Sequence, residues 1–262
     1  SRTGYEEVQR RRKLYEVGLL RIRINEMVNE DAARRLGEPL NVDDRYFVQS
    51  VKSFADGALG SRGALMLEEY SDYPGFHGEP VRSEDELAEA ATELLPLGFN
   101  LRVHTIGDGA NHVAINAFER ALEATGVDGR EARFALEHAQ IFTPSDLPRL
   151  VELGIVASVQ PLHATEDMNF AEARIGAERM EHAYNWSELL DLGVPLATGT
   201  DYSVSPYNPF YTLHAAVTRQ DRNDQPPDGW HPDQALTREE ALRAATMGAA
   251  YAMKAEDILG SI

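Results

Sequence analysis

Four apolar segments of the chain each end on a side chain that can bind a metal ion or carry a proton. Three of them end as Val-Gln-Ser-Val-Lys52, Asn-Leu-Arg-Val-His104 and Phe-Ala-Leu-Glu-His138, and the fourth leads through Ala-Thr-Gly-Thr to Asp201. If these segments are parallel strands of one sheet, their carboxyl ends meet at the same rim, where barrel enzymes carry their active sites. The pattern therefore favours a fold that brings the four side chains together.

Segments typical of strands and helices alternate along the chain without an internal repeat, which indicates a parallel sheet with right-handed crossovers. Capping boxes are expected at Ser83 with Glu86 and at Thr237 with Glu240, and Asp108 is expected to cap a helix. The predicted strands are 19–25, 47–54, 99–105, 132–138, 155–160 and 195–201. The predicted helices are 5–17, 30–36, 83–95, 111–124, 143–154, 185–192, 207–219 and 237–253. Two long loops, 55–80 and 161–180, are expected to form walls of a site.

The charge balance excludes several classes of partner. Lys and Arg total 25 against 43 Asp and Glu, a formal charge of −18, so the surface repels nucleic acid and anionic lipid. Only Lys13, Lys52 and Lys254 are lysines. Such an acidic, lysine-poor surface is typical of salt-adapted proteins, although solubility alone would also explain it.

The absence of cysteine removes disulfides, thiolate metal sites and a Cys nucleophile, so a metal would rest on His, carboxylate or modified Lys. No apolar run approaches the roughly 18 residues that a membrane span needs. The first residues do not have the pattern of a signal peptide. We expect a soluble, cytoplasmic protein.

His104, His138 and Asp201 offer the neutral nitrogen and carboxylate oxygen ligands that a divalent metal prefers. A single His at the end of a strand is more often a hydrogen-bonded structural residue. The prediction of a metal site therefore depends on the recurrence of such residues at successive strand ends. Lys52 differs, because an ammonium repels cations. The simplest role for Lys52 is a salt bridge to Asp56, without any part in metal binding. A desolvated lysine also loses its proton easily, and the neutral amine can react with CO2 to form a carbamate, which is an anionic oxygen donor.

Several motifs together resemble the amidohydrolase superfamily, and within it the branch that contains N-substituted formamide deformylase and the exoenzyme regulatory proteins. The resemblance spans nearly the whole chain. The motifs are Val-Lys52-Ser-Phe-Ala-Asp56-Gly-Ala-Leu-Gly-Ser-Arg62, Val-His104-Thr-Ile-Gly-Asp108, Glu137-His138-Ala, Gln160-Pro-Leu-His163-Ala-Thr-Glu-Asp167-Met and Gly199-Thr-Asp201-Tyr-Ser-Val-Ser-Pro206.

This resemblance implies an α/β fold, the metal-dependent (β/α)8 TIM barrel. It implies that a carbamylated Lys52 bridges metals, that His104 and His138 are metal ligands, and that Asp201 is a metal-linked general base. Zinc is the first expectation for the metal, and iron or manganese also suits nitrogen and oxygen ligands.

The chain departs from this superfamily in one important respect. Members carry a His-x-His pair at the end of their first strand, and this sequence has none. By that comparison the six predicted strands are the third to the eighth. We expect residues 1–262 to form the barrel domain without its first two strands and without the small β-sandwich. One of two metal positions would then lose most of its ligands.

His163 and Asp167 follow a predicted strand, so they are expected to orient the substrate or the metal ligands, or to be ordinary loop residues. Arg62 is a candidate contact for a substrate carbonyl or anion, although a pair with Glu68 or Glu69 is the simpler expectation. The remaining histidines are assigned to helix faces or loops without function: His77, His112, His182, His214 and His231.

Two functions remain open. The first is a metal-dependent hydrolase that acts on carbon–nitrogen bonds other than peptide bonds, in an amide, formamide or cyclic amide of small size, through metal-activated water. The second is a non-catalytic regulatory or ligand-binding protein on a degenerate barrel, suggested by the missing pair. Retention of all four strand-end groups favours the enzyme. A homo-oligomer is compatible with an open sheet, because unpaired strand edges invite association.

Overall fold

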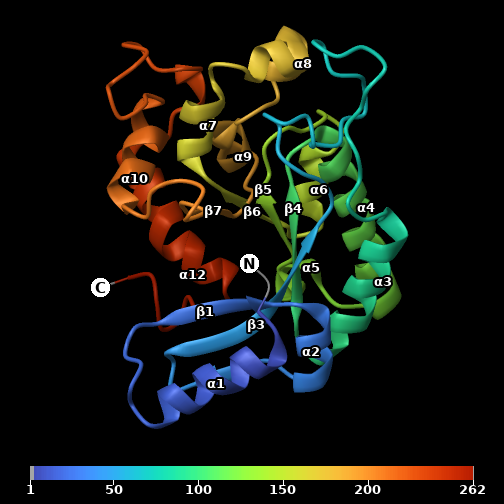
Figure 1. Ribbon diagram of the computed structural model, residues 1–262, viewed down its shortest axis with the longest axis vertical. Helices are drawn as coiled ribbons and strands as arrows, with labels where there is room; N and C mark the ends of the chain where they lie inside the picture. Colours follow the sequence, from blue (N-terminus) through green and yellow to red (C-terminus); the bar gives the residue numbers. More distant parts are fainter. Residues whose placement is uncertain (1–2, 262) are drawn as a thin grey trace.

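Six strands lie side by side in the order β1-β3-β4-β5-β6-β7 (Figure 1). The computed structural model describes residues 3–261. Neighbours along this path are all parallel, as the alternation of segments predicts. The strand bounds are β1 Ile24–Val28, β3 Tyr46–Phe54, β4 Asn100–Thr105, β5 Ala135–His138, β6 Val156–Val159 and β7 Leu196–Thr198. A further short strand, β2 (Leu40–Val42), pairs with β3 in the antiparallel direction, which the sequence did not predict.

Helices connect the strands and cover the outer face of the sheet (Figure 1). The α-helices are α1 Tyr5–Glu16, α2 Glu30–Leu36, α3 Glu84–Leu94, α4 Asp108–Thr125, α5 Gly129–Ala132, α6 Leu147–Glu152, α7 Pro161–Asp167, α8 Ala171–Met180, α9 Trp186–Asp191, α10 Pro209–Thr218, α11 Arg238–Arg243 and α12 Ala249–Ala252. Short 3-10 helices are η1 (Leu95–Leu97) and η2 (Pro232–Gln234), and a π-helical turn, η3 (Ala244–Gly248), joins α11 to α12.

Several predicted segments differ from the structure. The strand expected at 132–138 begins only at Ala135, after α5, and the strand expected at 195–201 ends at Thr198, so Asp201 lies beyond it. The strand expected at 19–25 begins only at Ile24, and its alternating residues Leu19 and Ile22 are largely exposed. The loop expected at 161–180 contains α7 and α8, so that prediction was wrong. The helical pattern in this stretch of sequence is broken into short pieces, because Gly176 has a positive φ of 79° and interrupts α8.

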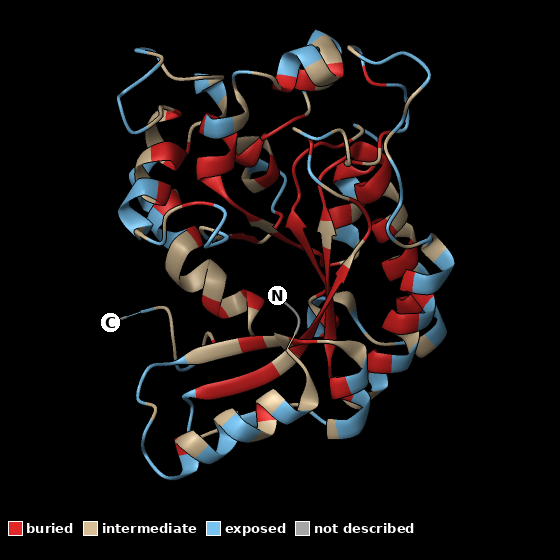
Figure 2. Cartoon of the chain, viewed as in Figure 1, coloured by how far each residue is buried: buried red, intermediate tan, exposed pale blue. Residues whose placement is uncertain are grey.

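The outer face of the sheet is apolar. Val51, Val103 and Leu136 have no exposed surface and belong to the same core as Leu87 of α3 and Phe118 of α4. Burial of one such side chain stabilises a fold by roughly 1.5–3 kcal/mol. Figure 2 shows the central strands largely in the buried colour, between helices whose outer sides are exposed. This packing fixes which side of each strand faces inward.

The inner face of the sheet is polar. Lys52 lies opposite Arg102, and His104 lies opposite Glu137, in the parallel register. Directly opposed residues share a face of a sheet, so these four side chains point to the interior. The charged groups of the molecule's interior are thus arranged on neighbouring strands, and the candidate site lies at their carboxyl ends.

The sheet does not close into a barrel. Within residues 3–261, β1 and β7 are the two ends of the strand path and are not paired with each other. The chain near α12 reaches the interior, where the Arg102 guanidinium donates to the Ala252 carbonyl and the Gln49 amide donates to the Met253 carbonyl. The expectation of an incomplete α/β barrel is confirmed.

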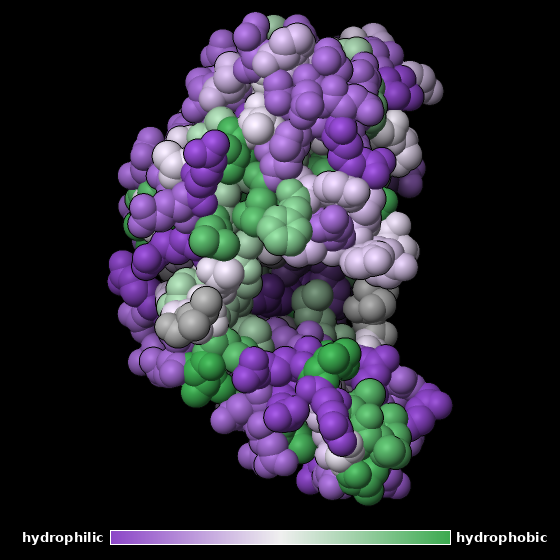
Figure 3. Space-filling model, turned by 90° about the vertical axis from the view of Figure 1, so that its left-hand side faces the viewer, coloured by the Kyte–Doolittle hydropathy of each residue, from purple (hydrophilic) through white to green (hydrophobic). Residues whose placement is uncertain are grey.

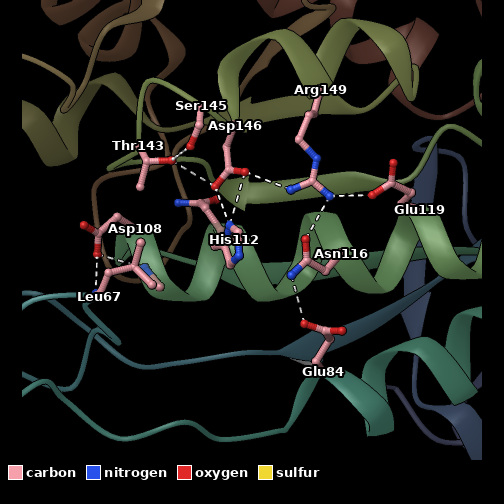
Figure 4. A network of polar contacts seen from close by, with 12 residues as sticks. Leu67, Glu84, Asp108, His112, Asn116, Glu119, Thr143, Ser145, Asp146 and Arg149 are labelled. Atoms are coloured by element: carbon pink, nitrogen blue, oxygen red, sulfur yellow. Dashed lines mark hydrogen bonds and ion pairs between the residues drawn. The ribbon is translucent and has the colours of Figure 1, made fainter.

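A polar network ties the outer helices together (Figure 4). His112 of α4 contacts the buried Asp146, with 2.9 Å between Nδ1 and Oδ2, and Arg149 of α6 donates to the same carboxylate at 2.9 Å. Arg149 also donates to Glu119 at 2.6 Å. His112 therefore lies in a contact between helices, as its assignment to a helix face predicts. Among residues 3–261, no helix is both long and apolar enough to cross a membrane.

Candidate metal centre

Three side chains form a group that can hold a metal ion. Atoms of His138, His163 and Asp201 that can bind a metal all lie within 4.8 Å of one another. His138 is the last residue of β5, His163 lies in α7 directly after β6, and Asp201 follows β7. Three neighbouring strands or the segments that follow them therefore each bring one potential metal ligand to the same rim of the sheet.

His104 joins this group from β4. Its ring centroid is 4.4 Å from that of His138, and the rings of His138 and His163 are 5.6 Å apart. His104 Nε2, His138 Nδ1 and His163 Nε2 are buried and have no hydrogen-bond partner among the described residues. A buried polar atom without a partner is costly, so the free nitrogens of His138 and His163 beside Asp201 fit a bound cation. His104 Nε2 lies 3.5 Å from Asp56 Oδ1, so His104 borders this group from the side of Asp56.

The protonation state of these histidines suits metal binding. Burial, together with the nearby charge of Lys52, lowers the pKa of His104 to about 4. Burial and the neighbouring His104 hold the pKa of His138 well below its usual value. Both imidazoles are therefore neutral near pH 7, which is the form that binds a metal.

Lys52 lies on the inner face with only 8% of its surface exposed. Burial lowers the pKa of its amine, although the carboxylates of Glu137 and Asp201 act in the opposite direction. The salt bridge to Asp56 that the sequence allows is not found among residues 3–261. Asp56 instead accepts backbone N–H groups of Leu65 at 2.9 Å and Gly107 at 2.8 Å. Lys52 is thus a desolvated amine beside the histidines.

Backbone strain occurs at two of the site residues. His138 has a φ of 80° and Asp201 a φ of 51°, both in the left-handed region that is uncommon for residues other than glycine. In a regular strand His138 would point away from the face that carries Glu137, because side chains alternate. The left-handed backbone breaks this alternation and places the imidazole beside His104. Such a conformation costs about 1–3 kcal/mol and is typical of functional sites.

A second polar network, which the sequence did not reveal as a unit, lies behind the histidines. The Tyr184 hydroxyl donates to Asp167 Oδ2 at 2.7 Å, and the Gln140 amide donates to the Tyr184 oxygen at 2.7 Å and to Asp167 at 3.2 Å. Asp167 follows His163 by one turn of α7, and Gln140 follows His138 by two residues. The network therefore connects two ligand-bearing segments.

A buried ion pair forms the floor below the histidines. Arg102 donates to Glu137 at 2.8 Å, and the Ser158 hydroxyl donates to the same carboxylate at 2.8 Å. Burial alone would raise the pKa of Glu137, but Arg102 and Lys52 outweigh it and lower that pKa. Glu137 thus stays ionised beside Lys52. Glu137 was within reach of sequence reasoning, because it directly precedes the candidate residue His138.

Two further predictions need correction. Arg62 pairs with neither Glu68 nor Glu69, because its guanidinium donates to Asp72 at 3.0 and 2.9 Å. Asp108 is the first residue of α4 and not its cap. The cap is Gly107, and Asp108 Oδ1 accepts the Leu67 N–H at 2.9 Å. The Arg62 pair therefore lies within the 55–80 loop, whereas Asp108 ties that loop to the start of α4.

Comparison with known proteins assigns the family. A sequence model of the amidohydrolase family matches residues 2–262. The chain belongs to the amidohydrolase family. The resemblance seen in the strand-end motifs is thereby confirmed, and the half-barrel is the expected framework for an amidohydrolase site at the carboxyl ends of the strands.

Individual relatives are similar over part of their length. Protein LONG AFTER FAR-RED 3 of Arabidopsis thaliana is 35% identical over 220 residues, which cover 82% of this chain and 36% of the relative. N-substituted formamide deformylase of Arthrobacter pascens is 27% identical over 248 residues, 91% of this chain and 42% of the enzyme. The crystal structure of an uncharacterised metal-dependent hydrolase of Pyrococcus furiosus superposes with a TM-score of 0.85 at 31% identity, over 99% of this amidohydrolase chain and 52% of that one.

Proposed function

We propose that this amidohydrolase is a metal-dependent hydrolase of carbon–nitrogen bonds other than peptide bonds, with an amide, formamide or cyclic amide of small size as its substrate. The observation that carries the proposal is the convergence of His138, His163 and Asp201 at one rim, where buried nitrogens of both imidazoles have no hydrogen-bond partner. The His104 ring packs against His138 in the same place. A scaffold that only binds a ligand has no need for this set of groups.

In this proposal His104, His138, His163 and Asp201 hold a divalent metal, with zinc first and iron or manganese as alternatives. When bound, the metal would polarise the substrate carbonyl and lower the pKa of water. Lys52 contributes as a carbamate, because a buried amine with a lowered pKa reacts readily with CO2. The carbamate carries a negative charge and oxygen donors, whereas the free ammonium would repel the cation.

Asp201 moves the proton. Its side chain is exposed while its carboxylate stays within reach of His138 and His163. Asp201 takes a proton from the water as the new carbon–oxygen bond forms, and delivers it to the nitrogen as the carbon–nitrogen bond breaks. The products are a carboxylic acid and an amine, so atoms and charge balance without a further reactant.

The relatives support the class of reaction. One of them is named for deformylation of N-substituted formamides, and a structural neighbour is titled a metal-dependent hydrolase. The chain spans less than half the length of the first and about half of the second. For this reason the hydrolase activity of the whole protein is a proposal. We propose in addition that the protein is cytoplasmic and forms a homo-oligomer.

Metal content per chain tests the proposal first. Protein purified without chelator and supplied with bicarbonate should hold about one zinc or iron ion. Lys52→Ala and His163→Ala should each weaken metal binding by about tenfold or more, because each removes a donor. His112→Ala is the matched control, since His112 lies between α4 and the buried Asp146, and should leave the metal content unchanged.

Hydrolysis of simple amides is the second measurement. Asp201→Asn should lower turnover by about 100-fold or more, because it removes the proton acceptor. Protein that binds the metal but hydrolyses no amide, with or without Asp201, would contradict the enzyme and favour a regulatory or ligand-binding role.

A further inference from the structure

The segment that follows Asp201 exposes apolar and aromatic side chains beside the candidate metal centre. Tyr202, Val204 and Tyr207 have 69%, 70% and 76% of their surface exposed. Residues 202–218 contain no Asp, Glu, Lys or Arg, in a chain that is 26% charged. Contiguous exposed apolar groups are uncommon on a soluble surface and mark binding sites.

The backbone of this segment is anchored, so the exposed side chains have a defined position. The Val204 N–H donates to the Asp201 carbonyl at 2.8 Å. The hydroxyl of Ser205, which is buried, donates to Glu166 of α7 at 3.0 Å. Tyr202 and Tyr207 meet edge to face, with their ring centroids 5.7 Å apart. This arrangement is a favourable geometry for aromatic pairs and keeps both rings together.

The segment is continuous with the metal centre on two sides. Asp201, the residue directly before Tyr202, belongs to the ligand group. Glu166, which anchors the segment, lies in the same helix as His163. Figure 3 shows the face of the molecule that carries α10, on which hydrophobic groups gather above a hollow. A substrate held at Asp201 would lie next to Tyr202, the adjoining residue, and next to Tyr207, whose ring packs against that of Tyr202.

We propose that Tyr202, Val204 and Tyr207 form a recognition wall for an aromatic substituent of the substrate. The inference rests on the proposed function and specifies its substrate class, namely amides that carry an aromatic or large apolar group. The rings offer apolar faces and edges that pack against another ring. The wall itself holds no charge and lies beside the carboxylates of Asp201 and Glu166, so an anionic substituent binds poorly there.

The test measures ligand binding and turnover separately, on the zinc-loaded chain. The ligands are N-benzylacetamide, N-methylacetamide and N-acetylglycine, with dissociation constants from calorimetry and hydrolysis followed by amine release. N-Benzylacetamide should bind at least about tenfold more tightly than N-methylacetamide, and N-acetylglycine should bind weakly. The Tyr202→Ala, Tyr207→Ala double variant should lose this preference by about tenfold, whereas Tyr207→Phe, which retains the ring, should keep it.

Leu19→Ala is the matched control, because Leu19 is 72% exposed in the segment between α1 and β1 and should not alter the preference. Equal binding of the three ligands, or a preference that survives in the double alanine variant, would overturn the inference. Absence of hydrolysis with the binding preference intact would reject the proposed function and leave the wall in place.

Discussion

At the scale of single residues, the candidate site combines strained ligands with a supporting network. His138 and Asp201 both have a left-handed backbone, which costs free energy that surrounding contacts must offset. Hydrogen bonds of Gln140 and Tyr184 to Asp167 join the segments that follow His138 and His163. The network thus limits the movement of two ligands that come from different strands.

This arrangement predicts the effect of removing one hydroxyl. Tyr184→Phe should weaken metal binding by about tenfold, because residues that orient ligands affect metal affinity to this degree. It should also lower the free energy of unfolding by about 1–2 kcal/mol, because the hydroxyl donates to Asp167 and accepts from Gln140. Metal titration and chemical denaturation measure the two effects.

Tyr15→Phe is the matched control for that variant. The Tyr15 hydroxyl, also largely buried, donates to the Ile22 carbonyl at 2.6 Å, far from the histidines. Its loss should reduce stability similarly and leave metal affinity unchanged. If both variants bind metal as well as the original protein, Tyr184 has no positioning role.

At the scale of elements, the 55–80 loop is fastened to the start of α4 beside the site. Asp56 accepts the N–H groups of Leu65 and Gly107, and Asp108 accepts that of Leu67. A Cβ added to Gly107 would lie 1.9 Å from the Leu65 carbonyl oxygen, which is backbone and has little freedom to move. Only glycine allows the loop to approach the helix this closely.

Gly107→Ala should therefore destabilise the protein by roughly 2 kcal/mol, within the range for overpacked positions. Gly4→Ala is its control, since the added Cβ meets only Asn29 Nδ2 at 3.9 Å and φ is −85°. Gly4 is the N-cap of α1, so that change should cost about 0.5 kcal/mol, well below the effect of Gly107→Ala. Equal midpoints of denaturant unfolding for both variants would show that the loop adjusts without cost.

The sequence predicted those elements whose signals are local. Both capping boxes, at Ser83 and Thr237, form as expected because each involves residues three positions apart. The parallel strand order follows from short apolar runs that alternate with helices. The helices within 161–180 were missed, since α7 is short and buried and α8 is interrupted at Gly176. Gly176, with its positive φ, interrupts the helical pattern of residues 171–180, which are otherwise rich in helix-forming residues.

The site was predicted in part, for a similar reason. His104, His138 and Asp201 end apolar runs, so position along a strand revealed them. His163 was expected to orient other groups or to be an ordinary loop residue, because it follows its strand instead of ending it. Its imidazole nevertheless lies within 4.8 Å of the atoms of His138 and Asp201 that can bind a metal. Tyr184 gave no signal, since it is 44 residues from its hydrogen-bond partner Gln140 and only the fold brings them together.

At the scale of the whole molecule, the dominant feature is the net charge of −18. Such a charge opposes the compact state by self-repulsion. Salt screens this repulsion, because the Debye length falls from about 10 Å at 0.1 M to about 3 Å at 1 M. Salt also weakens the surface ion pairs that Arg residues make with acids, but exposed pairs contribute little. Repulsion should therefore decide the sign of the salt effect.

The melting temperature should rise when NaCl increases from 0.05 M to 1 M, by about 3 °C for each kcal/mol of repulsion removed. A matched variant replaces three exposed helix residues that have no ion pair among residues 3–261, Glu89, Glu123 and Glu152, with Lys. Each replacement adds two positive charges, so the net charge moves from −18 to −12. The variant should melt higher at low salt and respond less to added NaCl. A melting temperature that falls with salt would instead show that attractive ion pairs outweigh repulsion in this acidic chain.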